Sequence, residues 1–171
     1  MKRTIIAQLL ILFLNIGRTF SEQTSIFQWG DVSNHLRMSI SLENGKNEIS
    51  LGHEILLRVC IQNLTSNQTI HVHEFNQAIM DKSFAVKITS QIGDVLIPEK
   101  DISRYGGSGL VYFISPKQVH ESELNISLLY AIKTVGLYKI VVTKTISDDL
   151  KIFPKTDVVS NPICVKIVPK K

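Results

Sequence analysis

The feature that most constrains this chain is a two-residue alternation of apolar and polar side chains, which recurs from about residue 36 to the end. In the first run Leu36, Met38, Ile40 and Leu42 alternate with polar residues. Similar runs occupy 55–62, 70–75, 84–89, 124–128, 137–145 and 163–167. Alternation at this period is typical of a β-strand with one buried face and one solvated face. Almost no helical periodicity accompanies it.

Three further segments complete the expected secondary structure. Val95–Ile97 predicts a short strand that Pro98 ends, 110–114 predicts a strand that is apolar throughout, and Leu129–Ile132 predicts a single helical turn. About eight or nine short strands result, separated by turn signals such as Asn44-Gly45 and Gly93-Asp94. Two sheets packed face to face bury the apolar side of every such strand. The sequence therefore predicts an all-β, immunoglobulin-like antiparallel sandwich of about seven to nine strands.

The N-terminal segment differs from the rest of the chain. Lys2 and Arg3 precede an apolar run of about a dozen residues, and small residues stand at Thr19 and Ser21. This pattern predicts a secretory signal peptide, 1–21, with cleavage after Ser21. An uncleaved membrane anchor is the alternative, although the run is short for a bilayer about 30 Å thick. The expected organisation is a signal peptide helix at 1–21, a loose lead-in at 22–34 and the sandwich at 35–171.

Removal of the leader changes the charge of the protein. The 19 Lys and Arg residues include three before Glu22, so 16 remain against 15 acidic residues. A nearly neutral domain does not favour nucleic acid as a partner, because such binding needs a concentrated basic patch. The expected location is secreted or periplasmic, with no stable membrane span after cleavage.

The two cysteines fall on the outward phase of their strands. Cys60 and Cys164 alternate with residues assigned to the core, so both thiols are expected to point away from it. Outward side chains on different sheets exceed the roughly 7 Å Cα separation that a disulfide allows. The sequence therefore predicts no intramolecular disulfide.

Several short motifs resemble a known family. In chain order these motifs are Trp29-Gly30, 36–40, 52–59, Gln62-Asn63, 124–130, 136–140 and Ser160-Asn161-Pro162-Ile163. Together, over roughly 29–168, they resemble the uncharacterised bacterial exported immunoglobulin-like domains, and more distantly the bacterial proteinase-inhibitor β-sandwich. The matched residues are structural, so the resemblance implies no active site. Gly136-Leu137-Tyr138 also indicates a tyrosine corner, in which the Tyr138 hydroxyl bonds nearby backbone.

Two groups of residues are candidates for chemistry. His71 and His73, at i and i+2 on one strand, with Glu74, form a candidate zinc site that needs another ligand from His35, His53 or His120. A solvated strand face is the competing interpretation.

The second candidate is a glycine-rich loop for binding, namely Arg104, Tyr105, Gly106, Gly107 and Ser108. It lacks the features of a phosphate-binding loop.

No recognisable nucleophile turn or carboxylate pair is present, so we expect no enzyme and no cofactor. The expected function is a non-enzymatic exported binding module with an unknown protein or surface partner. The alternatives are an exported proteinase inhibitor, using loop 99–109 or loop 63–69, and a metal-dependent hydrolase.

Overall fold

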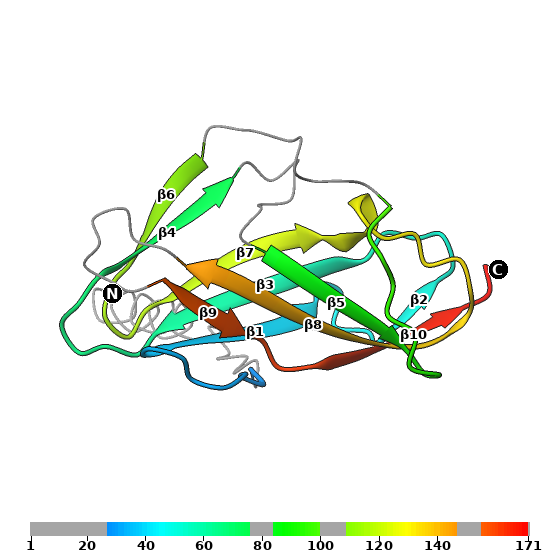
Figure 1. Ribbon diagram of the computed structural model, residues 1–171, viewed down its shortest axis with the longest axis horizontal. Helices are drawn as coiled ribbons and strands as arrows, with labels where there is room; N and C mark the ends of the chain where they lie inside the picture. The colour runs from blue at the N-terminus through cyan, green and yellow to red at the C-terminus, as the bar shows by residue number, and fades with distance from the viewer. Residues whose placement is uncertain (1–26, 76–83, 100–108, 147–154, 171) are drawn as a thin grey trace, which may run out of the picture.

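The computed structural model describes residues 27–75, 84–99, 109–146 and 155–170, which form two packed β-sheets and a smaller strand pair. The back layer in Figure 1 has the order β1-β3-β7, from β1 (Leu36–Leu42), β3 (Leu56–Asn63) and β7 (Val119–Asn125). The front layer has the order β2-β10-β8-β5, from β2 (Glu48–Ser50), β10 (Ile163–Val168), β8 (Gly136–Ile146) and β5 (Phe84–Ser90). A further strand of this layer, β9 (Thr156–Val159), pairs with β8. The third sheet pairs β4 (Ile70–Phe75) with β6 (Gly109–Ile114).

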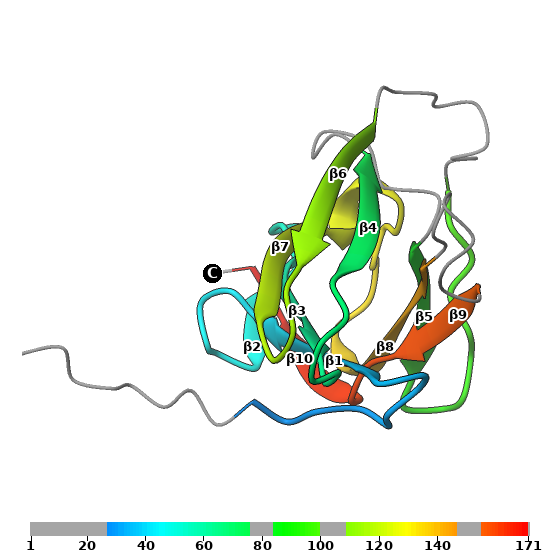
Figure 2. The ribbon, with the colours of Figure 1, turned by 90° about the vertical axis from the view of Figure 1, so that its left-hand side faces the viewer.

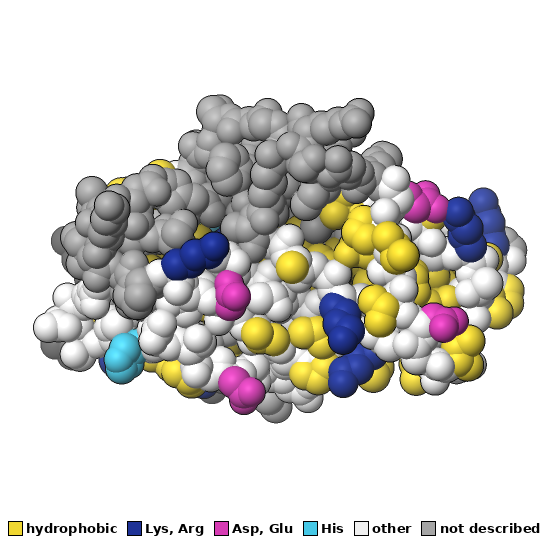
Figure 3. All heavy atoms as spheres, in the orientation of Figure 1, with side chains coloured by type: hydrophobic (Ala, Val, Ile, Leu, Met, Phe, Trp, Pro, Cys, Tyr) yellow, Lys and Arg dark blue, Asp and Glu magenta, His cyan; other side chains and the backbone are white. Residues whose placement is uncertain are grey.

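The core lies between the two large sheets and follows the alternation in the sequence. In β1 the side chains of Leu36, Met38 and Ile40 are at most 2% exposed, and β8 contributes Tyr138, Ile140 and Val142 from the opposite sheet. Burial of a large aliphatic side chain stabilises a fold by roughly 1.5–3 kcal/mol. The facing apolar stripes therefore hold the layers together, while the outer faces carry mixed side chains. Figure 3 shows this mixture on the front face, where Lys or Arg side chains lie among apolar ones over β5 and β8.

The strand order confirms the predicted immunoglobulin-like sandwich. Strands β1, β3 and β7 take the places of strands A, B and E, and β5, β8 and β10 take those of C, F and G. The predicted tyrosine corner is present at the start of β8, where the Tyr138 hydroxyl donates to the Thr134 carbonyl oxygen at 3.0 Å and lies 2.6 Å from the Thr134 hydroxyl. One departure from antiparallel pairing is β2, which runs parallel to β10.

A bulge separates β9 from β10. Val159 pairs with Thr143 and Ile163 pairs with Ile140, so three residues of one strand face two of β8. The Ser160 hydroxyl accepts a bond from the Val142 N–H at 3.0 Å, which replaces a missing backbone acceptor. The bulge turns residues 160–162 toward β1, where Met38 and Ser160 form an isolated parallel bridge.

The β4–β6 pair extends beyond one end of the sandwich (Figure 2). It continues the β3–β7 pair past a bend at Asn63, whose fully buried side chain donates to the carbonyl oxygens of Gln68 and Ile114. The Asn63 Oδ1 also accepts from the N–H and hydroxyl of Thr65. This network fixes the loop between β3 and β4.

Two sequence-based assignments of secondary structure are wrong. The strand predicted over 124–128 ends at Asn125, whose side chain accepts from the Ser127 N–H and caps a short 3₁₀ helix, η2 (Ile126–Leu128). The helical turn therefore comes earlier than the predicted 129–132. The strand predicted at Val95–Ile97 is only an isolated bridge between Val95 and Thr89.

The environment of Cys60 also differs from the prediction. Both cysteines are free thiols, as expected, and Cys164 is exposed, but the Cys60 residue is only 1% exposed. Cys60 lies on the middle strand of its sheet, between Ser39 of β1 and Glu121 of β7, so neighbours flank it on both sides. Burial raises the pKa of the Cys60 thiol to about 11, and the nearby Glu121 carboxylate adds to the shift.

Candidate functional site

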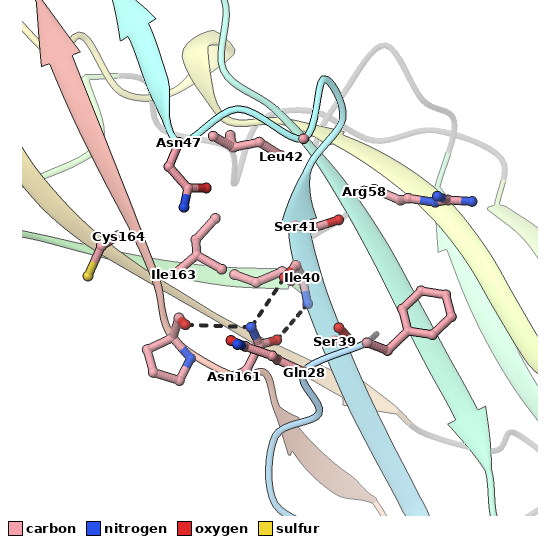
Figure 4. Close-up of a pocket in the computed structure, with 13 residues that line it drawn as sticks. Gln28, Ser39, Ile40, Ser41, Leu42, Asn47, Arg58, Asn161, Ile163 and Cys164 are labelled. Atoms are coloured by element: carbon pink, nitrogen blue, oxygen red, sulfur yellow. Dashed lines mark hydrogen bonds between the residues drawn. The ribbon is translucent and has the colours of Figure 1, made fainter. Parts of the chain in front are cut away.

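A cleft opens along one edge of the sandwich, where the outer edge of β1 faces the start of β10. We call it the edge cleft and define its two walls as residues 39–42 and 161–164. The turn at Gly45–Asn47 bounds one end, Phe27 and Gln28 line it as well, and its volume is about 460 Å³. This volume falls in the usual range for ligand sites, roughly 300–1,000 Å³. Figure 4 shows the two walls with Asn161 between them.

Asn161 joins the two sheets at the base of the edge cleft. Its Oδ1 accepts from the Ile40 N–H at 2.8 Å, and its Nδ2 donates to the Ile40 carbonyl oxygen at 3.2 Å (Figure 4). Nδ2 also lies 3.5 Å from the Pro162 carbonyl oxygen. Asn161 and Ile40 are both buried. One side chain therefore gives the edge of β1 the two hydrogen bonds that a neighbouring strand normally supplies.

The segment before β1 covers the part of the β1 edge that lies on the N-terminal side of Ile40. The Gly30 N–H donates to the Met38 carbonyl oxygen at 2.9 Å. A Cβ at Gly30 would lie 2.2 Å from the Val159 carbonyl oxygen, so only glycine fits this approach to the bulge. The neighbouring Trp29 ring lies 4.4 Å from the Arg37 guanidinium carbon, in cation–π geometry. Residues 27–30 of the predicted lead-in are thus packed against the sandwich.

Beyond Asn161, toward the turn at Gly45–Asn47, backbone groups of Leu42 and Cys164 point into the edge cleft. The bonds of Met38 and Ile40 show that even-numbered residues of β1 direct their N–H and C=O groups away from β3. By the same alternation the Leu42 N–H faces the cleft. On the other wall the Lys166 N–H donates outward to Asn47, so the N–H and C=O of Cys164, two residues earlier, also face the cleft. Within the described part of the chain, these three groups have no hydrogen-bond partner.

The edge cleft carries little charge. Among the described residues Arg58 is its only charged lining residue, and it forms a bidentate pair with Glu121, with Nη2 2.7 Å from Oε2. That hydrogen bond raises the pKa of Arg58 further. No histidine, aspartate or glutamate of the described part of the chain lines the cleft, whose polar surface comes from hydroxyl and amide side chains such as Ser39, Ser41 and Asn47. Such a lining suits a neutral ligand that forms hydrogen bonds.

The candidate zinc site lies elsewhere, on the β4–β6 pair. His71 pairs with Phe113, and its ring meets the Phe113 ring edge-on at 4.8 Å. His73 and Glu74 pair with Val111 and Leu110. Among the described residues, no three His, Cys, Asp or Glu side chains gather in a metal-binding group.

The zinc site stays a prediction, because the side chains of His73 and Glu74 lie outside the described ones. The other expected sites stay predictions as well. The predicted binding loop, Arg104 to Ser108, lies outside the described residues, as does the signal peptide, 1–21. Of the possible third zinc ligands, His120 stacks against Tyr112 at 4.5 Å. Across the described residues, no helix is long and apolar enough to cross a membrane.

The edge cleft was not predicted as a site from the sequence. Trp29-Gly30 and Asn161-Pro162 stood out only as family-like motifs, although their residue types were a signal. Glycine permits a close approach between two backbone segments, and an asparagine side chain can bond both the N–H and the C=O of a backbone. Asn161 and Ile40 are 121 positions apart in the sequence, so nothing local indicates that they meet.

Comparisons with known proteins identify no family. No protein-family model matches the chain, and neither does any curated protein. The C-terminal domain of Wzt aligns with a TM-score of 0.48 and 9% identity over 84% of this chain and 78% of that domain.

Two further solved structures align at lower TM-scores. The CARDB domain of the Pyrococcus furiosus PF1109 protein, solved in complex with di-metal ions, gives 0.37 and 15% identity over 83% of this chain and 91% of that one. The Listeria innocua β-glucosidase gives 0.40 and 13% identity over 90% of this chain and 20% of the enzyme. Such distant alignments carry no argument about function, which has to come from the site itself.

Proposed function

We propose that this protein is an exported, non-enzymatic binding module and that the edge cleft holds its ligand. The observation that carries the proposal is the cleft itself, about 460 Å³ between the edges of two sheets, with three backbone groups directed into it. A rigid concave surface with a few convergent polar groups is the usual form of a ligand site.

The lining favours binding over catalysis. General acid–base chemistry needs a titratable side chain such as histidine or a carboxylate near the reacting atoms. In the described part of the chain the edge cleft has neither, and the one cation in its described lining, Arg58, is engaged by Glu121. Cys164 lies on the rim without a histidine beside it in the lining, so a base-activated thiol nucleophile has no support.

Export is the second part of the proposal, and it rests on the basic start and apolar run of 1–21. Expression of the whole chain in its own host, followed by N-terminal sequencing, tests it. A mature protein that begins near Glu22 supports export with cleavage. A protein that begins at Met1 and stays in the cytosol contradicts it.

The binding site is tested by cross-linking from the rim of the cleft. Cys164 is exposed while Cys60 is buried, so a photoreactive maleimide labels Cys164 selectively. The matched control carries the same label at Ser66→Cys in a Cys164→Ala background. Ser66 is exposed in the loop that follows Asn63, and Asn63 pairs with Leu36 at the far end of β1 from the cleft.

Both labelled proteins are illuminated with the extracytoplasmic fraction of the host. The proposal predicts a discrete product from the Cys164 label that is absent with the Ser66→Cys label and is lost when Ser41→Arg fills the cleft. Equal products from the two positions, or a product that survives Ser41→Arg, place the binding site elsewhere.

A further inference from the structure

Three strand edges of the sandwich are protected against pairing with another chain. On β5 the outer edge is covered by the following loop, where the Leu96 N–H donates to the Ile88 carbonyl oxygen at 2.9 Å and the Ser90 N–H to the Asp94 carbonyl oxygen at 2.8 Å. Covering an edge in this way prevents pairing with another chain.

The edge at β7 is protected by charge instead. Among the described residues β7 pairs only with β3, and it carries the exposed carboxylates Glu121 and Glu123. Charged side chains on an edge strand discourage the addition of a further strand. The edge of β1 is closed by Gly30 and Asn161, as described above.

The edge cleft lacks both kinds of protection. Neither Leu42 nor Cys164 carries a charge, and the Leu42 N–H and both backbone groups of Cys164 face the opening. The residues on its walls, Ser39 to Leu42 and Asn161 to Cys164, are all uncharged. A strand edge with open hydrogen-bonding groups and no charge is a template for an extended polypeptide.

We propose that the ligand of the edge cleft is an extended, uncharged peptide segment of a partner protein, which binds by β-strand addition between β1 and β10. One peptide residue exchanges hydrogen bonds with the N–H and C=O of Cys164, and a neighbouring carbonyl accepts from the Leu42 N–H. Asn161 already bonds the Ile40 N–H and C=O as one residue of such a strand would. This inference rests on the proposed function, because it names the ligand class of the same site.

The cleft admits only a short segment. Asn161 closes one end, and the bond from the Lys166 N–H to Asn47 closes the other. On the β10 side the four residues 162–165 lie between these limits, which corresponds to roughly 13 Å of extended chain. Side chains of such a segment alternate between the cleft and solvent, so small or β-branched residues fit best at the inward positions.

The test compares two variants that both lack the Cys164 thiol. Cys164→Ala keeps the backbone N–H, whereas Cys164→Pro removes it, and proline is tolerated there because that N–H is not used in pairing with β8. The probe is a pool of acetylated, amidated pentapeptides of Val, Thr and Ser, titrated into the ¹⁵N-labelled full chain. Matched pools with N-methylated central amides, and a panel of neutral oligosaccharides, are titrated in parallel.

In the Cys164→Ala variant, strand addition predicts that the peptide pool shifts the amide resonances of Leu42 and of the alanine at position 164. It predicts binding about tenfold weaker in Cys164→Pro, the effect of one hydrogen bond at the upper end of its usual range. N-methylated peptides lose binding too, which serves as the test if Cys164→Pro does not fold.

Equal affinity of Cys164→Pro and Cys164→Ala for the peptides, or no change at the two amides, overturns strand addition. Shifts at the edge cleft with an oligosaccharide alone also overturn it but leave the proposed binding site intact. If the cross-linking experiment yields no product that depends on the cleft, the proposed function fails together with this inference.

Discussion

Replacement of Asn161 by alanine tests whether one side chain closes the edge of β1. The substitution removes two buried hydrogen bonds, at 2.8 and 3.2 Å, and leaves the N–H and C=O of Ile40 without their partner. A buried polar group left unsatisfied costs about 1–3 kcal/mol. Ile40 has two such groups, so we expect Asn161→Ala to reduce the free energy of unfolding by about 2–6 kcal/mol. The lower end applies if water enters the opened base of the cleft.

Urea denaturation followed by tryptophan fluorescence measures this loss. Trp29 is the only tryptophan, and it lies beside Gly30 on the segment that covers the same edge. A loss of this size lowers the melting temperature of a domain this large by roughly 5–15 °C. The matched control is Asn67→Ala, an exposed loop position expected to change stability by less than about 0.5 kcal/mol. If Asn161→Ala is as stable as Asn67→Ala, the side chain does not join the sheets and the account of the cleft fails.

Three further predictions concern the same framework. Gly30→Ala places a methyl group against backbone of the bulge, so we expect a loss of about 1–3 kcal/mol in urea denaturation, and unchanged stability would contradict the close approach. Tyr138→Phe removes the hydroxyl that bonds Thr134, so we expect a loss of about 1 kcal/mol, while an equally stable variant would show that the tyrosine corner is not needed. Because the pKa of Cys60 is raised to about 11, little of its thiolate forms at a pH of about 8. A thiol reagent should therefore modify only Cys164 in the folded protein and both cysteines in urea. Rapid modification of both thiols in the folded protein would refute the burial of Cys60.

The sandwich was predictable because half-buried strands carry a local signature. Alternating apolar residues identified β1, β3 and β10 with the correct inward phase, since Leu36, Val59 and Val165 are all buried, and β8 was predicted as the longest strand. Each of these strands has one face against the core, so every second residue is apolar and buried.

Strands that depend on long-range pairing left no such signature. Most of β7 was missed because its inward positions before Leu124 are His120 and Ser122, so no apolar alternation marks the strand. The short strands β2 and β9 each span too few residues for a period to emerge. Their place in the fold is set by β10 and β8 rather than by their own sequence.

The edge cleft could not be inferred from local sequence for a related reason. It depends on Gly30 meeting Val159 and on Asn161 meeting Ile40, contacts between residues more than a hundred positions apart. The burial of Cys60 was missed for the same reason, although the alternation correctly placed this residue on the outer face. Its burial depends on the neighbouring strands β1 and β7, which flank it on both sides, and not on the sequence around Cys60.

Amide hydrogen exchange of the full chain, alone and with the partner identified by cross-linking, tests whether the edge cleft is the binding site. We expect the backbone amides of Leu42 and Cys164 to become protected together when the partner binds, because both face the edge cleft. The amides of β7 and of the β4–β6 pair should exchange as they do in the free protein. Protection confined to those strands, with Leu42 and Cys164 unchanged, would contradict the assignment of the edge cleft as the binding site.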